Sequence, residues 1–357
     1  MKKTRIVAAV MGNGHIGLLE QDIPPVTAGT VLVEVHSSLV SPGTELQGWG
    51  GLKRQRLHPD PDAKPQPFGY ANAGYVLAVG EGVTKFKPGD RVACIGAGLA
   101  LHTNYAVIPQ NLCFPIPENV SFAQASYVML AATSLQALRR GEPQFGESVA
   151  IVGLGLIGQL AAQLYHLAGN YIIGWDTMET RTEIARACGI DAVAVVGKDD
   201  EAALTKAFTG NYGLDAAVFA FQGDGTQVLE TITPCMKCTP DGHYMGRIIV
   251  VGGITLTFPM TTTNLDIRKS SRTGAGYHDS AWELGRDYPQ TYMRWTTQTN
   301  IELCLRLIAE GKLNVDTLTT HTIALENVDE EISTIIDEPE KILGVNFSMQ
   351  HADSTFH

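Results

Sequence analysis

Three glycines and one acid carry the clearest chemical signal in this sequence of 357 residues. Gly153, Gly155 and Gly158 follow an apolar run typical of a strand, and a helical pattern of leucines begins directly after them. Asp176 closes a second strand-like run further along the chain. A strand, a GxGxxG turn, a helix, a second strand and an acid in this order predict a site that binds a dinucleotide.

Each glycine of this turn has its own task in such a site. Gly153 permits the tight turn, Gly155 lets a pyrophosphate approach the backbone, and Gly158 lets helix and strand pack closely. The helix N-terminus adds free N–H groups and a partial positive charge. The competing interpretation is a glycine-rich turn in an α/β core that binds nothing. The predicted cofactor contacts of the turn are Gly153, Leu154, Gly155, Leu156, Ile157 and Gly158.

The acid also indicates which cofactor binds. A carboxylate at Asp176 accepts hydrogen bonds from the ribose hydroxyls of the adenosine and repels a 2′-phosphate, which favours NAD over NADP. No arginine occupies the next two positions, although Arg181, expected on the helix that follows, can soften this preference.

Composition excludes several classes of function. A formal charge of −11 argues against nucleic acid or an anionic membrane as the main partner, and 44% hydrophobic residues describe a globular chain. No apolar run reaches transmembrane length. The basic and then apolar N-terminus is too short for a signal peptide and predicts a first strand, so we expect a cytoplasmic protein acting on a small polar substrate.

The six cysteines are scattered, as expected of reduced thiols in a cytosolic enzyme. Cys235 and Cys238 have CxxC spacing, but no second pair of ligands stands nearby. We therefore expect no metal in this chain and no redox role for the pair.

The chain divides into two patterns. Residues 1 to about 120 are rich in alternating strand segments, and residues 125 to 275 alternate between strands and helices. A segment at 48–67, rich in Gly, Pro and charge, predicts a mobile loop, and 351–357 predicts a frayed tail.

Three segments resemble one family. The turn Lys-Pro-Gly-Asp-Arg-Val at 87–92, the glycine turn and the closing segment 246–253 are similar to the medium-chain dehydrogenase/reductase superfamily. The resemblance implies an α/β fold, with a GroES-like β-rich catalytic domain (1–124 and 296–357) and a doubly wound parallel-sheet Rossmann domain for NAD (125–295). It also implies a homodimer or homotetramer.

The departures from the family concern zinc. Where zinc-dependent members have a catalytic cysteine this chain has Ser41 or Pro42, and where they have Gly-His-Glu it has Gly69, Tyr70 and Ala71. The third ligand position and the lobe with four cysteines have no counterpart either. A catalytic zinc needs three protein ligands, so the resemblance implies a zinc-free member.

The resemblance also transfers roles to single residues. Tyr70 replaces a lost zinc ligand and so faces the substrate, where a phenol can donate to a substrate oxygen, or pass a proton if its pKa is lowered. Thr44 matches the proton-relay hydroxyl, and Glu45 follows the position of an acid that supports the metal. Packing, a local turn and a solvated carboxylate are the respective alternatives. Positions that match nicotinamide contacts are Thr133, Phe221, Gln222, Val251, Gly252 and Gly253.

A segment rich in aromatic and charged residues, 274–295, is the second informative stretch. Aromatic faces beside hydrogen-bonding charges suit a polyhydroxylated ligand. The segment resembles that of zinc-free members linked to sugar and cyclitol metabolism, and an interdomain or dimer-interface loop is the alternative. The predicted substrate contacts are Tyr277, His278, Arg286, Tyr292, Arg294 and Trp295.

These patterns favour a zinc-independent oxidoreductase that transfers a hydride between NAD and a secondary alcohol or ketone of a sugar, glycoside or cyclitol. A quinone or enoyl reductase is the first alternative, although such enzymes usually prefer NADPH. A hydroxyethyl-chlorophyllide-type dehydrogenase and an NAD-binding protein without catalysis are the others.

Overall fold

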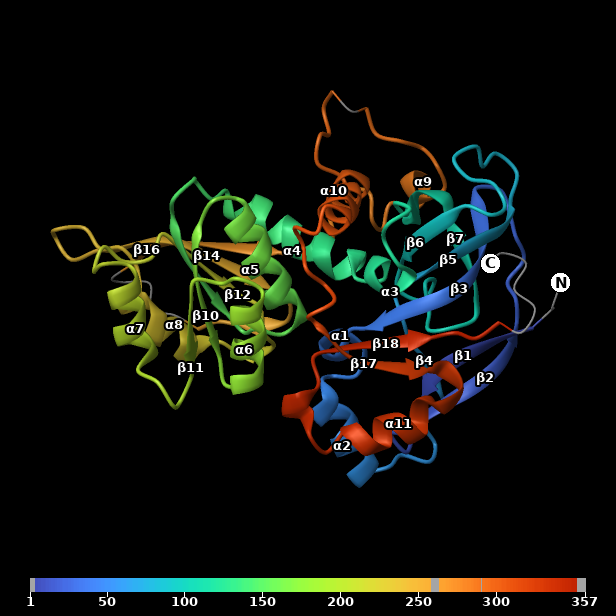
Figure 1. Cartoon of the computed structure of the whole chain (residues 1–357), viewed down its shortest axis with the longest axis horizontal. Coiled ribbons are helices and arrows are strands. Elements are labelled where there is room, and N and C mark those ends of the chain that lie inside the picture. Colours follow the sequence, from blue (N-terminus) through green and yellow to red (C-terminus); the bar gives the residue numbers. More distant parts are fainter. Residues whose placement is uncertain (1–3, 258–262, 290, 352–357) are drawn as a thin grey trace. The chain divides into compact units, whose positions relative to one another are not determined.

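The computed structural model describes residues 4–257, 263–289 and 291–351 (Figure 1). The chain forms two compact units. Unit 1 contains Met1–Met129, Gly274–Gly311 and Thr319–His357, and unit 2 contains Leu130–Thr273 and Lys312–Leu318. None of the helices in the described residues has the length and apolar character that a membrane span requires.

Unit 1 is built mainly from antiparallel strands. Its larger sheet has the order β17-β18-β3-β5-β6-β8, with β7 on β3, and its smaller sheet has the order β2-β1-β4. The strands are β1 (Thr4–Val10), β2 (Ile16–Asp22), β3 (Thr30–Val40), β4 (Gln66–Pro67), β5 (Ala71–Val79), β6 (Arg91–Ile95), β7 (Tyr105–Pro109), β8 (Cys113–Pro115), β17 (Thr319–Ala324) and β18 (Gly344–Ser348). The helices are α1 (Pro42–Glu45), α2 (Trp49–Leu57), α3 (Phe122–Ala125), α9 (Ser280–Glu283), α10 (Thr297–Ala309) and α11 (Val328–Ile335).

Unit 2 is organised around a parallel sheet with the order β11-β10-β9-β12-β14-β16 (Figure 1). Its strands are β9 (Ser148–Val152), β10 (Tyr171–Asp176), β11 (Ala192–Val195), β12 (Ala216–Phe219), β14 (Tyr244–Val251) and β16 (Thr263–Ser270), with a small pair β13 (Gly223–Asp224) and β15 (Ile254–Thr255). Its helices are α4 (Val128–Gly141), α5 (Leu156–Leu167), α6 (Glu179–Ala187), α7 (Glu201–Phe208) and α8 (Thr226–Ile232).

Helices cover both faces of this sheet because its strands are apolar on both sides. Val149 and Ile151 of β9 pack into a core shared with α4, α5 and α6, and Ala150 and Val152 pack into a second core that includes α8. The chain order of the strands reverses between β9 and β12, which is the arrangement of a doubly wound dinucleotide fold. The predicted fold class, a β-rich unit plus a Rossmann unit, is confirmed.

Three local expectations differ from the structure. The predicted mobile loop at 48–67 contains helix α2, which is held because Trp49 and Leu52 are buried and Arg56 donates to the Gly14 carbonyl oxygen at 3.0 Å. Residues 274–295, predicted inside the Rossmann domain, belong to unit 1. Of the predicted frayed tail, His351 is ordered against β3, and 352–357 lie outside the described residues.

Candidate active site

The glycine turn has the geometry that its sequence predicts. Gly153 has a φ of 88°, a left-handed conformation that favours glycine. A Cβ on Gly158 would lie 1.8 Å from the Gly153 carbonyl oxygen, so a larger residue does not fit there. A Cβ on Gly155 meets nothing within 4 Å. The turn therefore leaves open space at the one glycine where a pyrophosphate is expected to approach.

The residues between these glycines offer mainly their backbone. Leu154 and Leu156 bury their side chains, and Ile157 packs against the core on one side of the sheet. α5 begins at Leu156 without a side-chain cap. Its first N–H groups are free of intrahelical partners by the geometry of a helix start, which suits an anionic ligand.

Asp176 lies at the carboxyl end of β10 beside the glycine turn. Its Oδ2 accepts a hydrogen bond from the Leu154 N–H at 2.7 Å, and its Oδ1 accepts one from the Met178 N–H at 2.8 Å. Arg181 lies 3.5 Å from the same carboxylate. The acid is thus fixed at the mouth of the turn, with a cation beside it.

The other predicted cofactor positions of unit 2 fall on the same edge of the sheet. Phe221 and Gln222 follow β12, while Val251 ends β14 and Gly252 and Gly253 follow it. β12 lies between β9 and β14, and parallel strands bring their carboxyl ends to one edge. The sheet therefore assembles these segments into one crevice-forming edge, as the pattern predicts.

Thr133 lies on α4 and is half-buried. The next residue, Ser134, donates to the Ile157 carbonyl oxygen at 3.0 Å, in the first turn of α5. This bond ties α4 to the start of the helix that follows the glycines, so Thr133 belongs to the same neighbourhood of unit 2.

In unit 1, Tyr70 lies near Ser41 and helix α1. It is buried, and the side chains of Ser41 and Thr44 lie near its hydroxyl. Burial, with the nearby charge of Glu45 as the second cause, raises the pKa of Tyr70 well above its ordinary value, and Tyr277 adds to this effect. Tyr70 therefore stays protonated, which contradicts a role that depends on a lowered pKa.

Glu45 is the acid at the centre of this group. Its Oε2 accepts a hydrogen bond of 2.6 Å from the Ser41 N–H, and the Nε2 atom of His102 lies 3.4 Å from the same oxygen. Its Oε1 is buried and has no hydrogen-bond partner among the described residues. A buried carboxylate oxygen without a partner is costly and points to a group that binds there.

His102 is completely buried and held on every side. Its Nδ1 lies 2.7 Å from the hydroxyl of Ser38, and its ring packs edge-on against Phe68 and Phe347, with centroids 4.7 and 4.8 Å away. The sequence pattern gave no reason to assign His102 a catalytic role. The only local indication that His102 is buried was its position after the apolar run that ends at Leu101.

The segment 274–295 does not act as one surface. Tyr277 is buried, and its hydroxyl accepts from the Ala97 N–H at 2.9 Å. His278, exposed and with a φ of 74°, stacks on Tyr277 at 3.9 Å between ring centroids. The remaining predicted contacts have exposed side chains: Arg286, Tyr292, Arg294 and Trp295. The guanidinium of Arg294 lies over the ring of Trp295. Tyr277 is thus the buried member of this set, and its partner Ala97 follows Gly96, whose N–H donates to the Tyr70 carbonyl oxygen at 3.0 Å.

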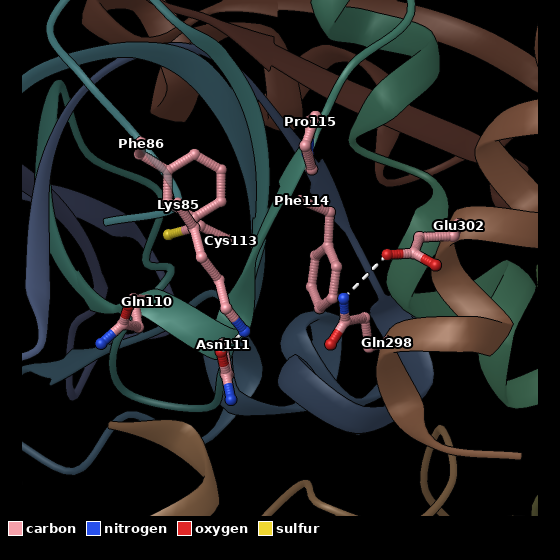
Figure 2. Close-up of a pocket in the computed structure, with 9 residues that line it drawn as sticks. All are labelled: Lys85, Phe86, Gln110, Asn111, Cys113, Phe114, Pro115, Gln298 and Glu302. Carbon is pink, nitrogen blue, oxygen red and sulfur yellow. Dashed lines mark hydrogen bonds between the residues drawn. The ribbon is translucent and has the colours of Figure 1, made fainter. Parts of the chain in front are cut away.

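A small cavity of unit 1, drawn in Figure 2, is lined by none of the predicted site residues. It has a volume of about 100 Å³ and lies between the segments around Lys85, Phe114 and Gln298. Lys85 donates to Asp287 at 2.9 Å, and Gln298 donates to Glu302 at 2.9 Å. A cavity of this size with its polar groups already paired is below the range of small-molecule sites.

Comparisons with known proteins agree with this architecture. Residues 27–118 match the family model of the alcohol dehydrogenase GroES-like domain. Sorbitol dehydrogenase of Mus musculus is 22% identical over 366 residues, which cover 93% of each chain. These similarities support the medium-chain dehydrogenase/reductase superfamily.

Two solved structures share the fold of this chain. An Escherichia coli oxidoreductase/dehydrogenase of unknown specificity has a TM-score of 0.78 at 18% identity, covering 98% of this chain and 100% of its own. Galactitol-1-phosphate dehydrogenase from Escherichia coli has a TM-score of 0.74 at 18% identity, covering 96% of this chain and 99% of its own. The named relatives support an oxidoreductase of the alcohol and polyol dehydrogenase type.

The positions of the catalytic zinc in this superfamily do not carry a ligand set here. Tyr70, Ser41 and Pro42 stand at those positions, and neither a phenol of raised pKa nor an aliphatic hydroxyl is a usual zinc ligand. Glu45 and His102 supply only two conventional ligands at this place. The residues present therefore do not fit a catalytic zinc with three protein ligands.

Proposed function

We propose that this protein is an NAD-dependent dehydrogenase that interconverts a secondary alcohol and a ketone on a polyol or sugar-type substrate without a catalytic zinc. The observation that carries the proposal is the buried group of Tyr70, Glu45 and His102, in which Tyr70 has the position that matches a zinc ligand of zinc-dependent members. It offers a hydrogen-bond donor and a carboxylate in place of a Lewis acid.

The glycine turn and Asp176 fit the cofactor. The open space at Gly155 suits the pyrophosphate, and the carboxylate of Asp176 suits the ribose hydroxyls. NAD, when bound, takes up or supplies the hydride. Arg181 lies 3.5 Å from Asp176 and so is engaged with the acid, which supports NAD over NADP.

Tyr70 supplies the donor. Because its pKa is raised, the phenol keeps its proton at ordinary pH and donates a hydrogen bond to the substrate oxygen. In the direction of ketone reduction, this bond stabilises the negative charge that develops on the carbonyl oxygen. The side chains of Ser41 and Thr44 lie beside this hydroxyl.

Glu45 supplies the proton acceptor. When the secondary alcohol is oxidised, it loses a hydride from carbon and a proton from oxygen, and the carboxylate takes the proton at Oε1. This is the buried oxygen without a partner among the described residues. His102 and the Ser41 N–H hold the other oxygen and keep the carboxylate oriented.

The substrate class comes from the relatives and from the chemistry of the site. The named relatives act on sorbitol and galactitol 1-phosphate, which are polyols. Several hydroxyl and phenol groups in one place (Ser41, Thr44, Tyr70, Tyr277) suit a ligand with many hydroxyls. A small polar substrate, a homo-oligomer and a cytoplasmic location belong to this proposal.

The decisive experiment is a turnover assay with full-length protein treated with a strong chelator. We expect NAD reduction with a polyol that carries a secondary hydroxyl, at a rate that the chelator and added Zn²⁺ leave unchanged. Activity that disappears with the chelator and returns with Zn²⁺ contradicts the zinc-free mechanism. NADH binding without turnover on any alcohol, ketone, quinone or enone supports a protein without catalysis.

A further inference from the structure

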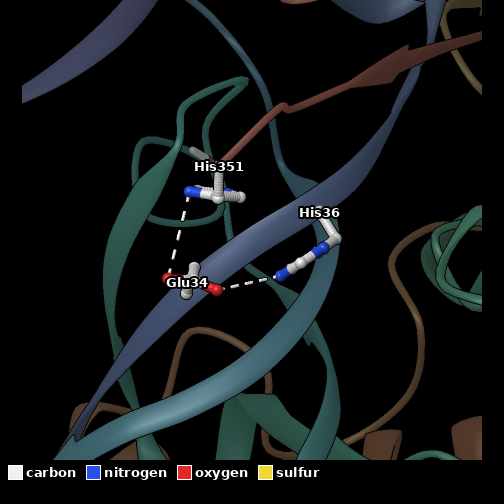
Figure 3. A group of neighbouring side chains, drawn as sticks. All are labelled: Glu34, His36 and His351. Carbon is white, nitrogen blue, oxygen red and sulfur yellow. Dashed lines mark hydrogen bonds and ion pairs between the residues drawn. The ribbon is translucent and has the colours of Figure 1, made fainter. Parts of the chain in front are cut away.

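Two histidines and a buried glutamate meet where the C-terminal segment of unit 1 pairs with β3 (Figure 3). One ligand atom from each of Glu34, His36 and His351 lies within 4.8 Å of the other two. Among the residues that the structure describes, this is the group of three histidine, cysteine or acidic side chains whose ligand atoms lie close enough together to hold one metal ion. Glu34 is almost completely buried.

Strand pairing brings these residues together, so their proximity follows from the fold and is not a chance contact of surface side chains. Glu34 and His36 are two residues apart on β3. β18 pairs antiparallel with β3, with Ser348 opposite Ser37, and extending this register places His351 opposite Glu34. The Met349 N–H donates to the His36 carbonyl oxygen at 3.1 Å, so the pairing continues beyond the end of β18.

The hydrogen bond of His351 decides which of its nitrogens is available. Its Nε2 lies 2.7 Å from the Val35 carbonyl oxygen, and because a carbonyl only accepts, Nε2 carries the proton. In the neutral ring the lone pair is then on Nδ1, which faces Oε2 of Glu34 at 3.9 Å. This distance is too long for a hydrogen bond, so in the neutral ring the lone pair of Nδ1 faces the carboxylate without one.

A cation between the two atoms resolves this arrangement. Histidine ligands of metals usually donate their second ring N–H to a carbonyl or carboxylate, as His351 does to Val35. Two ligands of one tetrahedral zinc lie roughly 3.4 Å apart when each bond is about 2.1 Å. The separations here, 3.0 Å from His36 Nε2 to Glu34 Oε1 and 3.9 Å from His351 Nδ1 to Oε2, lie on either side of that value.

We propose that Glu34, His36 and His351 form a site for a divalent transition-metal ion, with Zn²⁺ as the preferred occupant, which fastens the C-terminal segment to β3. Two imidazoles and a carboxylate are a borderline donor set that suits zinc better than calcium or magnesium. Aromatic rings of Tyr75 and Phe122 pack against His36, with centroids 5.2 and 5.1 Å away, and exclude water from one side. The site uses none of the residues assigned to the substrate or the cofactor.

The test is metal binding to full-length protein purified without a histidine tag and stripped of metal. We expect one equivalent of Co²⁺ to produce a visible absorption band of low-symmetry coordination, and Zn²⁺ to displace it and raise the Tm. His351→Ala and the conservative His36→Gln should each weaken binding about 10-fold or more. Since β18 ends at Ser348, His351→Ala keeps the strand, and circular dichroism checks the fold of both variants.

Two further variants make the result specific. His243→Ala removes another histidine paired with a carboxylate, Nδ1 to Asp241 at 3.2 Å in unit 2, and should bind Co²⁺ as the parent protein does. Glu45→Gln should also keep the band. The proposal is overturned if no stoichiometric binding occurs, if His243→Ala weakens binding as much as His351→Ala, or if Glu45→Gln abolishes it. The last result places the metal beside Tyr70 and contradicts the zinc-free mechanism as well.

Discussion

The Nε2 atom of His102 lies 3.4 Å from Oε2 of Glu45, and both side chains are almost completely removed from water. A buried carboxylate needs fixed partners, because its charge is poorly stabilised in the protein interior. Here both partners, the His102 ring and the Ser41 N–H, lie at Oε2, which leaves Oε1 for the reaction. The pair therefore combines a structural and a chemical role in one acid.

We expect Glu45→Gln to lower kcat roughly 100-fold or more, since the amide cannot accept the proton of the substrate and acid–base groups contribute about that much. The Kd for NADH should stay unchanged, because the predicted cofactor contacts belong to unit 2. Steady-state kinetics and fluorescence titration with NADH measure the two quantities.

His102→Gln should lower kcat less than Glu45→Gln, because His102 acts through the carboxylate as a positioning residue. His58→Gln, a change of an exposed histidine in the same unit, is the matched control and should have no effect. Equal kcat in the parent protein and in Glu45→Gln removes Glu45 from the mechanism.

Tyr70→Phe should lower kcat about 10-fold or more by removing the donor to the substrate oxygen. Since the pKa of Tyr70 is raised, its titration should not appear in the pH profile of kcat below the ordinary tyrosine value of about 10. Profiles of the parent protein and the variant should therefore differ in height and not in shape up to that pH. A basic limb that is present in the parent protein and lost in the variant contradicts the assignment of Tyr70 as a permanent donor.

The raised pKa of Tyr70 also predicts a stability effect at high pH. Above about pH 10 the unfolded chain loses the phenol proton while the folded chain keeps it, so the folded state binds more protons and the free energy of unfolding falls as pH rises. The pKa of buried Tyr165 in unit 2 is also raised, so its titration changes the free energy of unfolding in the same direction. Urea unfolding at several alkaline pH values should show a smaller decline for Tyr70→Phe. An identical decline in both proteins contradicts the burial of an uncharged phenol.

The repeating parts of the fold could be predicted from the sequence because they are local. The glycine turn, the run that ends at Asp176 and the strand at β12 each carry their signal within a few residues, and the parallel sheet follows from their alternation. The position of Asp176 beside the glycine turn could be predicted for the same reason. The preference for NAD stays a prediction.

The partners within unit 1 could not be predicted, because they meet through long-range pairing. His102 and Glu45 are distant in sequence, and only the pairing of the strands around them makes the ring a neighbour of the carboxylate. His351 stands 316 residues after Val35, whose carbonyl oxygen it contacts, and it meets Glu34 through the register of β18 on β3. α2 was missed because its composition is that of a loop and its stability comes from tertiary packing at Trp49 and Leu52.

Asp176→Ala should weaken NADH binding roughly 10- to 100-fold, the effect of losing charged hydrogen bonds to the ribose. It also frees Arg181 from its partner at 3.5 Å, so binding of NADPH should improve relative to NADH. Titrations with both cofactors measure the ratio. Asp176→Ala combined with Arg181→Ala should lose the gain in NADPH binding. A cofactor preference that does not change in Asp176→Ala contradicts the ribose assignment.

Two alanine substitutions in the glycine turn should separate cofactor binding from folding. Gly155→Ala places its Cβ where no atom of the chain lies within 4 Å, so the Tm should stay close to that of the parent protein while the Kd for NADH rises about 10-fold or more. Gly158→Ala places its Cβ 1.8 Å from the Gly153 carbonyl oxygen and should lower stability by about 1–3 kcal/mol through overpacking. Thermal unfolding and NADH titration of the two variants check the contrast. If Gly155→Ala binds NADH as the parent protein does, the open space at Gly155 is not the pyrophosphate site.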